Sequence, residues 1–266
     1  YAVTRMPATY AATAWVLGEA RERVSHPIRS VLDLGCGPGT ATWAAFETFN
    51  DIDQATLIDR DAGMMELGKR LGGDRFKSAT WALVPLDRGL KTTADLVVAG
   101  YAMNEVPPPK LAAIAGAIAA VATGLVAIIE PGTPRGHAVI QILREGLIAR
   151  GFRVVAPCPH DRPCPLSPDD WCHFTARLPR LKAHKLAKGA DVPFEDEPFS
   201  YCVLTAPSVS FERTPARILR RPVETKADKS FKLCTPEGLE TVSIPGRDKD
   251  RTRTTRRLGW GDAFPL

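Results

Sequence analysis

Three alternating glycines, Gly35-x-Gly37-x-Gly39, constrain the fold of this chain more than any other feature of its sequence. They follow a short apolar segment and open a helix-forming one, and this context gives such a pattern its meaning. Because glycine has no Cβ atom, the chain can turn sharply here and a ligand can approach the backbone. Asp59 ends the next apolar segment, 20 residues beyond Gly39, where a carboxylate can accept hydrogen bonds from ribose hydroxyls. These residues predict a Rossmann-type nucleotide-binding unit and leave NAD and S-adenosylmethionine as alternative ligands.

Segments of strand and helix character alternate through the first half of the chain. Apolar runs typical of buried strands lie at 30–34, 54–59, 94–99 and 124–130, and helical segments lie at 10–24, 40–49, 62–71 and 110–122. This alternation predicts an α/β fold, a parallel sheet with helices on both faces. The most apolar region, 111–129, is interrupted by Gly116, Thr123 and Gly124, so we expect no membrane-spanning helix.

The pattern changes after residue 131. The expected elements are an amphipathic helix at 137–150, strands at 152–156 and 198–206, and short strands at 230–234 and 239–244. Between them, 157–168 is too rich in proline and cysteine for regular structure. We therefore divide the chain into an N-terminal helical segment (1–29), a Rossmann-like domain (30–206) with a cysteine-rich, metal-binding insert (157–202), and a basic C-terminal β extension (207–266).

The two halves of the chain differ in charge. Residues 1–130 carry 12 Lys and Arg against 14 Asp and Glu, whereas residues 131–266 carry 23 against 16. Two stretches account for much of the excess: one comprises Arg177, Arg180, Lys182, Lys185 and Lys188, and the other is 213–257, with 13 basic and 6 acidic residues. A basic half joined to a neutral one favours a nucleic-acid partner. The alternative is a basic face that is merely solvated.

Most of the cysteines cluster in the second half of the chain. Four of the six lie within 45 residues, namely Cys158, Cys164, Cys172 and Cys202. Their gaps of five, seven and 29 residues match neither a zinc finger nor a ferredoxin. Clustered thiols in a chain of this class more often bind metal than form disulfides, and four thiolates suit zinc or an iron–sulfur cluster. We interpret His160 and His173 as solvated or hydrogen-bonded, and Cys234 as a structural strand residue.

Several segments together resemble a known family. Asp33-Leu34-Gly35-Cys36-Gly37-Pro38-Gly39 closely resembles motif I of class I methyltransferases, and 58–65 and 95–107 resemble segments that follow the second and fourth strands of those enzymes. With the cysteines, the chain resembles the mitochondrial small-ribosomal-subunit methyltransferase-like proteins and their bacterial relatives. The resemblance also includes 5–10, 104–107, 130–136, 158–160, 164–165, 171–174, 199–202 and 258–262.

The resemblance implies cofactors, site residues and a partner. S-adenosylmethionine is the implied cofactor, with Asp33, Gly35, Cys36, Gly37, Gly39, Asp59 and Tyr101 as its binding residues; Cys36 itself is expected to be a small packing residue, not a nucleophile. A four-iron four-sulfur cluster is implied on Cys158, Cys164, Cys172 and Cys202, with zinc as the alternative. The implied partner is the small ribosomal subunit and its RNA.

The composition of the chain indicates where the protein is located. The composition, rich in Ala, Arg and Pro, favours a bacterial origin and hence the cytoplasm; a eukaryotic member would lie in the mitochondrial matrix. The chain begins at Tyr1 without a methionine, so we expect a short N-terminal piece to be missing.

The sequence leaves catalysis open. S-adenosylmethionine donates its methyl group with little help, so the protein must mainly align an acceptor. The stretch Asn104-Glu105-Val106-Pro107 departs from the Asn/Asp-Pro-Pro-aromatic pattern of amino-group methyltransferases, and we expect Asn104 and Glu105 to cap the helix that begins near Pro108. No catalytic residue is therefore assigned. An RNA methyltransferase of the small subunit and a non-catalytic assembly factor remain the two functions to separate, with a small-molecule methyltransferase as the third.

Overall fold

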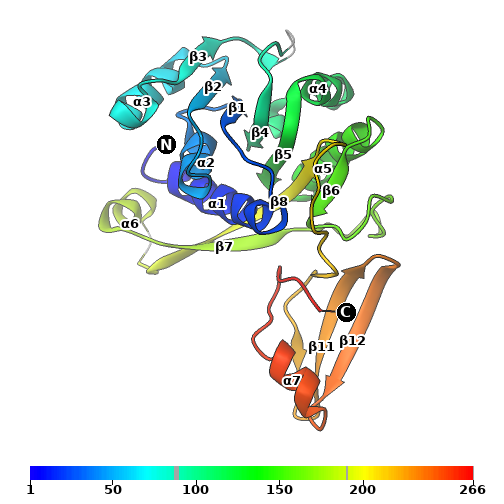
Figure 1. The fold of residues 1–266 in the computed structure, drawn as a ribbon. Helices are drawn as coiled ribbons and strands as arrows, with labels where there is room; N and C mark the ends of the chain where they lie inside the picture. The colour runs from blue at the N-terminus through cyan, green and yellow to red at the C-terminus, as the bar shows by residue number, and fades with distance from the viewer. Residues whose placement is uncertain (87–89, 190, 266) are drawn as a thin grey trace.

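A computed structural model describes residues 1–86, 90–189 and 191–265. Its main element is an eight-stranded sheet in the order β3-β2-β1-β4-β5-β8-β6, with β7 paired to β8 (Figure 1). The strands are β1 (Ser30–Leu34), β2 (Gln54–Asp59), β3 (Thr80–Leu83), β4 (Ala94–Gly100), β5 (Ala122–Pro131), β6 (Arg153–Ala156), β7 (Phe174–Pro179) and β8 (Phe194–Thr205). The first five strands are parallel, which confirms the predicted α/β sheet.

The last part of this sheet differs from the prediction. The expected strand at 198–206 begins earlier, as β8, and runs antiparallel to β5, β6 and β7. Strands β3 and β7 were not predicted, because each is short and only partly apolar. Regular structure in the cysteine-rich insert begins at Phe174 with β7, which is followed by a helix at Lys182–Lys188 and by most of β8.

Helices cover both faces of the sheet (Figure 1). They are α1 (Arg5–Arg23), α2 (Thr40–Thr48), α3 (Ala62–Gly72), α4 (Pro108–Val121) and α5 (Pro134–Ile148). The short α6 (Lys182–Lys188) lies between β7 and β8 in the chain, and 3₁₀ turns of the described residues span Gly73–Phe76 and Met103–Glu105. Helix α1 packs on α2 and α4 packs on α5. Among the described helices, none is long and apolar enough to cross a membrane.

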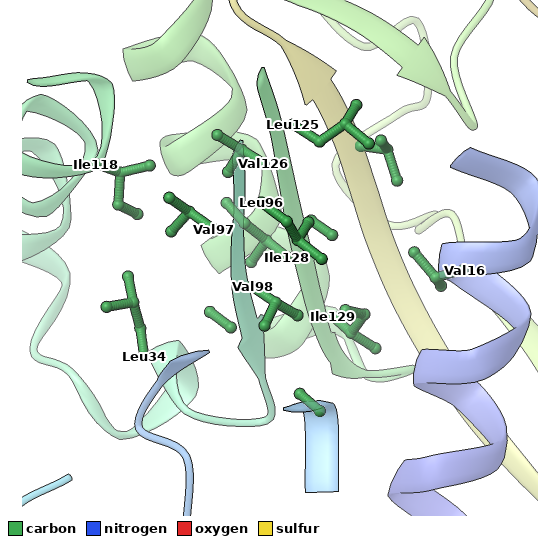
Figure 2. Packing of buried hydrophobic residues seen from close by; sticks show 14 of the residues in the cluster. Val16, Leu34, Leu96, Val97, Val98, Ile118, Leu125, Val126, Ile128 and Ile129 are labelled. Carbon is green, nitrogen blue, oxygen red and sulfur yellow. The ribbon is translucent and has the colours of Figure 1, made fainter. Parts of the chain in front are cut away.

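The core lies between these layers, around the central strands. Val97, Val98 and Ile128 are almost completely buried, because β4 and β5 are covered on both faces and therefore read as continuous apolar runs. Figure 2 shows Val16 of α1 on one side of these strands and Ile118 of α4 on the other. The chain order reverses between β1 and β4, and in such sheets the crevice at the carboxyl ends of these strands is where ligands bind.

The C-terminal extension forms a small sheet of its own. It contains β9 (Arg217–Ile218), β10 (Val223–Glu224), β11 (Asp228–Thr235) and β12 (Gly238–Pro245), followed by helix α7 (Lys249–Thr255). The β11–β12 hairpin contains both short strands predicted there. Phe231 and Phe264, with ring centroids 5.1 Å apart, pack in its core.

The extension is docked on the larger domain through buried polar contacts. Arg217 is almost fully buried and bonds to Glu19 of α1, to Thr214 at 3.0 Å and to the Pro157 carbonyl at 3.4 Å. Arg213 donates to Asp161 at 2.7 Å. The extension therefore closes over the start of the cysteine-rich segment.

Candidate functional site

The glycine segment forms a tight loop between β1 and α2. Gly35, Gly37 and Gly39 all have positive φ, between 51° and 82°. A Cβ atom on Gly35 would lie 2.4 Å from the Cβ of Ala102, so the close approach of the loop to the end of β4 requires glycine. A Cβ on Gly37 would meet no protein atom closer than 3.8 Å, so this glycine faces open space, where a ligand can approach.

Two aspartates support this loop. Asp33 is 1% exposed and accepts hydrogen bonds from the Thr42 amide at 3.0 Å and its hydroxyl at 2.8 Å. Burial raises the pKa of Asp33 to about 7. Asp59 accepts from the amide of Gly37 at 2.7 Å and from the amide of Asp61 at 2.8 Å. Asp59 thus fixes the loop, and each of its oxygens keeps a lone pair for a ligand hydroxyl.

The loop and both acids line one cavity of about 610 Å³, a size typical of small-molecule sites. Six of the seven residues assigned to the cofactor line it, namely Asp33, Gly35, Cys36, Gly37, Asp59 and Tyr101. Gly39 does not, because it precedes α2 as its cap and a Cβ there would lie 2.7 Å from the Phe76 ring. Burial, followed by the charges of Asp33 and Asp59, raises the pKa of Cys36, so its thiol is neutral packing at the cavity wall.

Other cavity residues were missed by the sequence analysis. Tyr1, Thr9 and Thr13 enter from α1 and the residues before it, and no motif marks that helix as part of a ligand site. Met64 also lines the cavity and belongs to the segment that resembles methyltransferases after their second strand. That resemblance was the available signal for Met64.

Tyr101 forms the cavity wall at the end of β4. It has a positive φ of 60°, which costs energy in a residue other than glycine, and residues strained in this way cluster at functional sites. The Arg5 guanidinium lies 5.5 Å from the centre of the Tyr101 ring and forms two 3.2 Å bonds to Glu197. Burial and the nearby Glu197 charge raise the pKa of Tyr101 well above its usual value, so its phenol is neutral.

The expected capping role of Asn104 and Glu105 is wrong. Helix α4 begins at Pro108 with Pro107 as its cap, and no side chain caps it. Glu105 instead pairs with Arg60 at 2.9 Å on the surface. The reason lies in the neighbouring strand: the buried Glu130 accepts the Met103 amide at 2.8 Å and holds 103–105 in its own 3₁₀ turn. Burial raises the pKa of Glu130 to about 8.

A second cavity brings together the clustered cysteines. Cys158, Cys164, Cys172 and Cys202 all line it, and so does Cys234 from β11. All are free thiols. Burial raises the pKa of each of the four, and that of Cys234 to about 12, so these thiols are neutral in the absence of metal. The interpretation of Cys234 as a residue apart from the cluster does not agree with this placement.

The fit of a metal to this cavity is partial. Its donors are all sulfur, and soft thiolates select zinc or iron–sulfur clusters. The space among them is small, about 20 Å³, and within the described ranges no three metal-binding side chains are arranged to hold an ion. Either group therefore requires the thiols to adjust. His160 and His173 lie outside the cavity wall: His160 contacts the Cys234 sulfur at 3.6 Å, and His173 contacts the Trp171 carbonyl at 3.2 Å.

The first basic stretch is largely neutralised by acids of β8. Arg177 makes two bonds to Asp196, at 2.7 and 2.8 Å. Arg180 bonds to Glu195 at 3.2 Å, and Lys188 bonds to the same carboxylate. Lys182 on α6 is exposed. Most of this stretch therefore stabilises the β7–β8 hairpin.

Comparison with known proteins gives one family for the whole chain. The profile of the family described as "Mitochondrial small ribosomal subunit Rsm22" matches residues 1–265. The human "Ribosome assembly protein METTL17, mitochondrial" is 24% identical over 288 aligned residues, covering 100% of this chain and 62% of that protein. The Rsm22-cox11 tandem protein 2 of Schizosaccharomyces pombe mitochondria is 22% identical, with 98% and 42% covered. The chain thus spans about two fifths to three fifths of these relatives.

Two solved structures have a similar fold at low sequence identity. The N-methyltransferase NodS of Bradyrhizobium japonicum has a TM-score of 0.48 and 13% identity, over 74% of this chain and 94% of that one. The magnesium protoporphyrin IX methyltransferase of Synechocystis PCC 6803, with bound S-adenosylmethionine, has a TM-score of 0.47 and 12% identity, over 76% and 79%.

Proposed function

Since this chain belongs to the mitochondrial small ribosomal subunit Rsm22 family, we propose that it binds S-adenosylmethionine and methylates RNA of the small ribosomal subunit during assembly. One observation supports the cofactor above all. The glycine loop, Asp33 and Asp59 line a single cavity at the carboxyl ends of β1 and β4, where such folds bind their ligands.

The residues of the cavity have separate tasks in this proposal. Asp59 accepts hydrogen bonds from the ribose, while Gly37 leaves the ligand room at the loop. Tyr101 would form the wall of the cofactor site at the end of β4. The cofactor supplies an electrophilic methyl group, so the protein contributes alignment of the acceptor, not proton transfer.

The partner is proposed from the relatives and from charge. The human relative is named a ribosome assembly protein, and the segment 213–257 carries 13 basic residues against 6 acidic ones. Basic side chains that neutralise phosphates release counterions, so binding to RNA should weaken steeply as salt rises. Phosphate contacts carry no sequence information, so specificity would come from the shape of the RNA. The place of action would be the bacterial cytoplasm, or the mitochondrial matrix in a eukaryote.

A second candidate is an assembly factor that keeps the cofactor without transferring its methyl group. The observation that favours it is the rim of the cavity. Glu105 is engaged by Arg60, and Asn104 does not line the cavity at all. Asn104 is therefore not placed to orient an acceptor nitrogen, and the carboxylate of Glu105, although it lines the cavity, is already paired with Arg60.

One experiment separates these functions. Purified protein is incubated with radiolabelled S-adenosylmethionine and immature small-subunit particles, and label in the RNA is measured beside cofactor affinity. Label incorporated by the wild type and by the surface variant Asp53→Ala, but reduced with Asp59→Ala, supports the methyltransferase. Tight cofactor binding without any label favours the assembly factor, and absence of cofactor binding refutes both.

The thiol cavity is proposed to hold a four-iron four-sulfur cluster on Cys158, Cys164, Cys172 and Cys202, with zinc as the alternative. Such a group supplies a rigid cross-link between the cysteine-rich segment and β8, and its binding is linked to folding. Anaerobically purified protein should be brown and contain about four irons per chain. Serine at any of the four positions should lower the metal content. Cys234→Ser tests the fifth thiol of the cavity, which contacts His160 at 3.6 Å; we expect unchanged metal content, and a loss of metal would make Cys234 a ligand.

A further inference from the structure

A buried arginine of α5 lines the thiol cavity. Arg144 lies in α5, is 1% exposed, and is among the lining residues of the cavity. A fully buried charge is costly unless it is paired, because the low-dielectric interior does not replace its hydration. The hydrogen-bond and charge partners of Arg144 therefore indicate whether this cavity is suited to an anionic ligand.

Among the described residues, hydrogen-bond acceptors are found at only one end of the Arg144 guanidinium group. Nη2 donates to the carbonyls of His160 and Arg162, both at 2.8 Å. Nε and Nη1 have no hydrogen-bond partner in the described part of the chain, although both are buried. No carboxylate of residues 1–86, 90–189 or 191–265 forms an ion pair with Arg144. Its positive charge is left without a counter-ion.

Arg217 on the same cavity provides the contrast. It is as deeply buried as Arg144, but it pairs with the carboxylate of Glu19 and donates to the oxygens of Thr214 and Pro157. The charge of Arg217 is therefore already balanced within the protein. Arg144 has no such carboxylate among the described residues, and the side chains of Cys158, Cys164 and Cys202 line the same cavity.

We propose that Arg144 is the counter-charge of an anionic metal–thiolate centre in this cavity, a positioning residue that the four cysteine ligands require in order to hold their metal. The inference rests on the proposed metal site. Four thiols that release four protons to solvent on binding a [4Fe–4S]²⁺ core, or a Zn²⁺ ion, form a centre of charge −2 in either case. The unpartnered Nε and Nη1 supply hydrogen bonds and positive charge to that centre.

The test compares three variants of Arg144 with a control on the same helix end. Arg144→Gln and Arg144→Met remove the charge, and Arg144→Lys keeps it. Arg150→Gln removes an exposed arginine just beyond the end of α5, whose hydrogen bond in the described part of the chain goes to the Gly146 carbonyl. Each full-length protein is reconstituted anaerobically, and three quantities are measured: the rate of metal release to excess chelator, the reduction potential, and the unfolding temperature with and without metal.

Loss of the charge should release metal about 10- to 100-fold faster, as expected for a residue that supports metal ligands. The reduction potential should become more negative, because adding an electron to an anionic centre is harder without a neighbouring cation. Arg144→Lys should keep a reduction potential close to that of the wild type. Arg150→Gln should equal the wild type in release rate, reduction potential and unfolding temperature. The unfolding temperature should fall more in the metal-bound than in the metal-free protein.

Three results would overturn the inference. They are wild-type potential and release rate in both neutral variants, equal destabilisation with and without metal, or a wild-type protein that binds neither iron nor zinc. A wild-type protein that holds one zinc refutes the cluster but not the role of Arg144, which is then decided by the rates of zinc release.

Discussion

Replacing Asp59 by alanine should weaken the binding of S-adenosylmethionine by a defined amount. The carboxylate makes short, charge-assisted bonds to the amides of Gly37 and Asp61, at 2.7 and 2.8 Å, and its free lone pairs face the cavity. Loss of a charged hydrogen bond costs about 1.5–3 kcal/mol. That range corresponds to a dissociation constant raised roughly 10- to 150-fold.

The assay is isothermal calorimetry with S-adenosylmethionine and its demethylated product. The affinity of Asp59→Asn should lie between those of Asp59→Ala and the wild type. The asparagine side chain keeps one acceptor oxygen, but its NH₂ group is placed against a backbone amide that is itself a donor. Asp53→Ala, at an exposed position before β2, is the matched control and should bind like the wild type. An affinity of folded Asp59→Ala within twofold of the wild type would refute the ribose assignment.

Three further predictions test the fold, its pH dependence and its RNA surface. Gly35→Ala places a Cβ 2.4 Å from that of Ala102 at a positive φ, so it should cost about 2 kcal/mol or more and lower the unfolding temperature by roughly 4–8 °C in a thermal melt. Glu130 has a folded pKa of about 8, above its unfolded value; its stabilising contribution is present below about pH 4.5 and is lost as pH rises toward 8, so Glu130→Gln should flatten the fall of urea midpoints over that window. If α6 contacts RNA, Lys182→Glu with Lys185→Glu should weaken small-subunit binding and lessen its salt dependence, and an unchanged salt slope would exclude this helix from the contact.

The sequence by itself determined the features that depend on neighbouring residues. Strands β1 and β2, the glycine loop and Asp59 follow one another along the chain, and the parallel pairing of β1 with β2 places Asp59 beside the loop. Apolar runs at β4 and β5 indicated buried central strands because both of their faces are covered. The family resemblance likewise depended on short contiguous motifs.

Only the tertiary structure decided which distant side chains meet. Arg180 looked available to RNA until β8 placed Glu195 beside it, and Cys234 joined the other thiols because the C-terminal sheet docks on the larger domain. Glu130 of β5 holds the turn that contains Asn104 by accepting the Met103 amide, so Asn104 does not cap α4. Arg144 lies within the amphipathic helix predicted at 137–150, and only the packing shows that it is buried beside the thiols with no carboxylate partner among the described residues. Burial and pairing arise between elements far apart in the chain, and local residue patterns do not encode them.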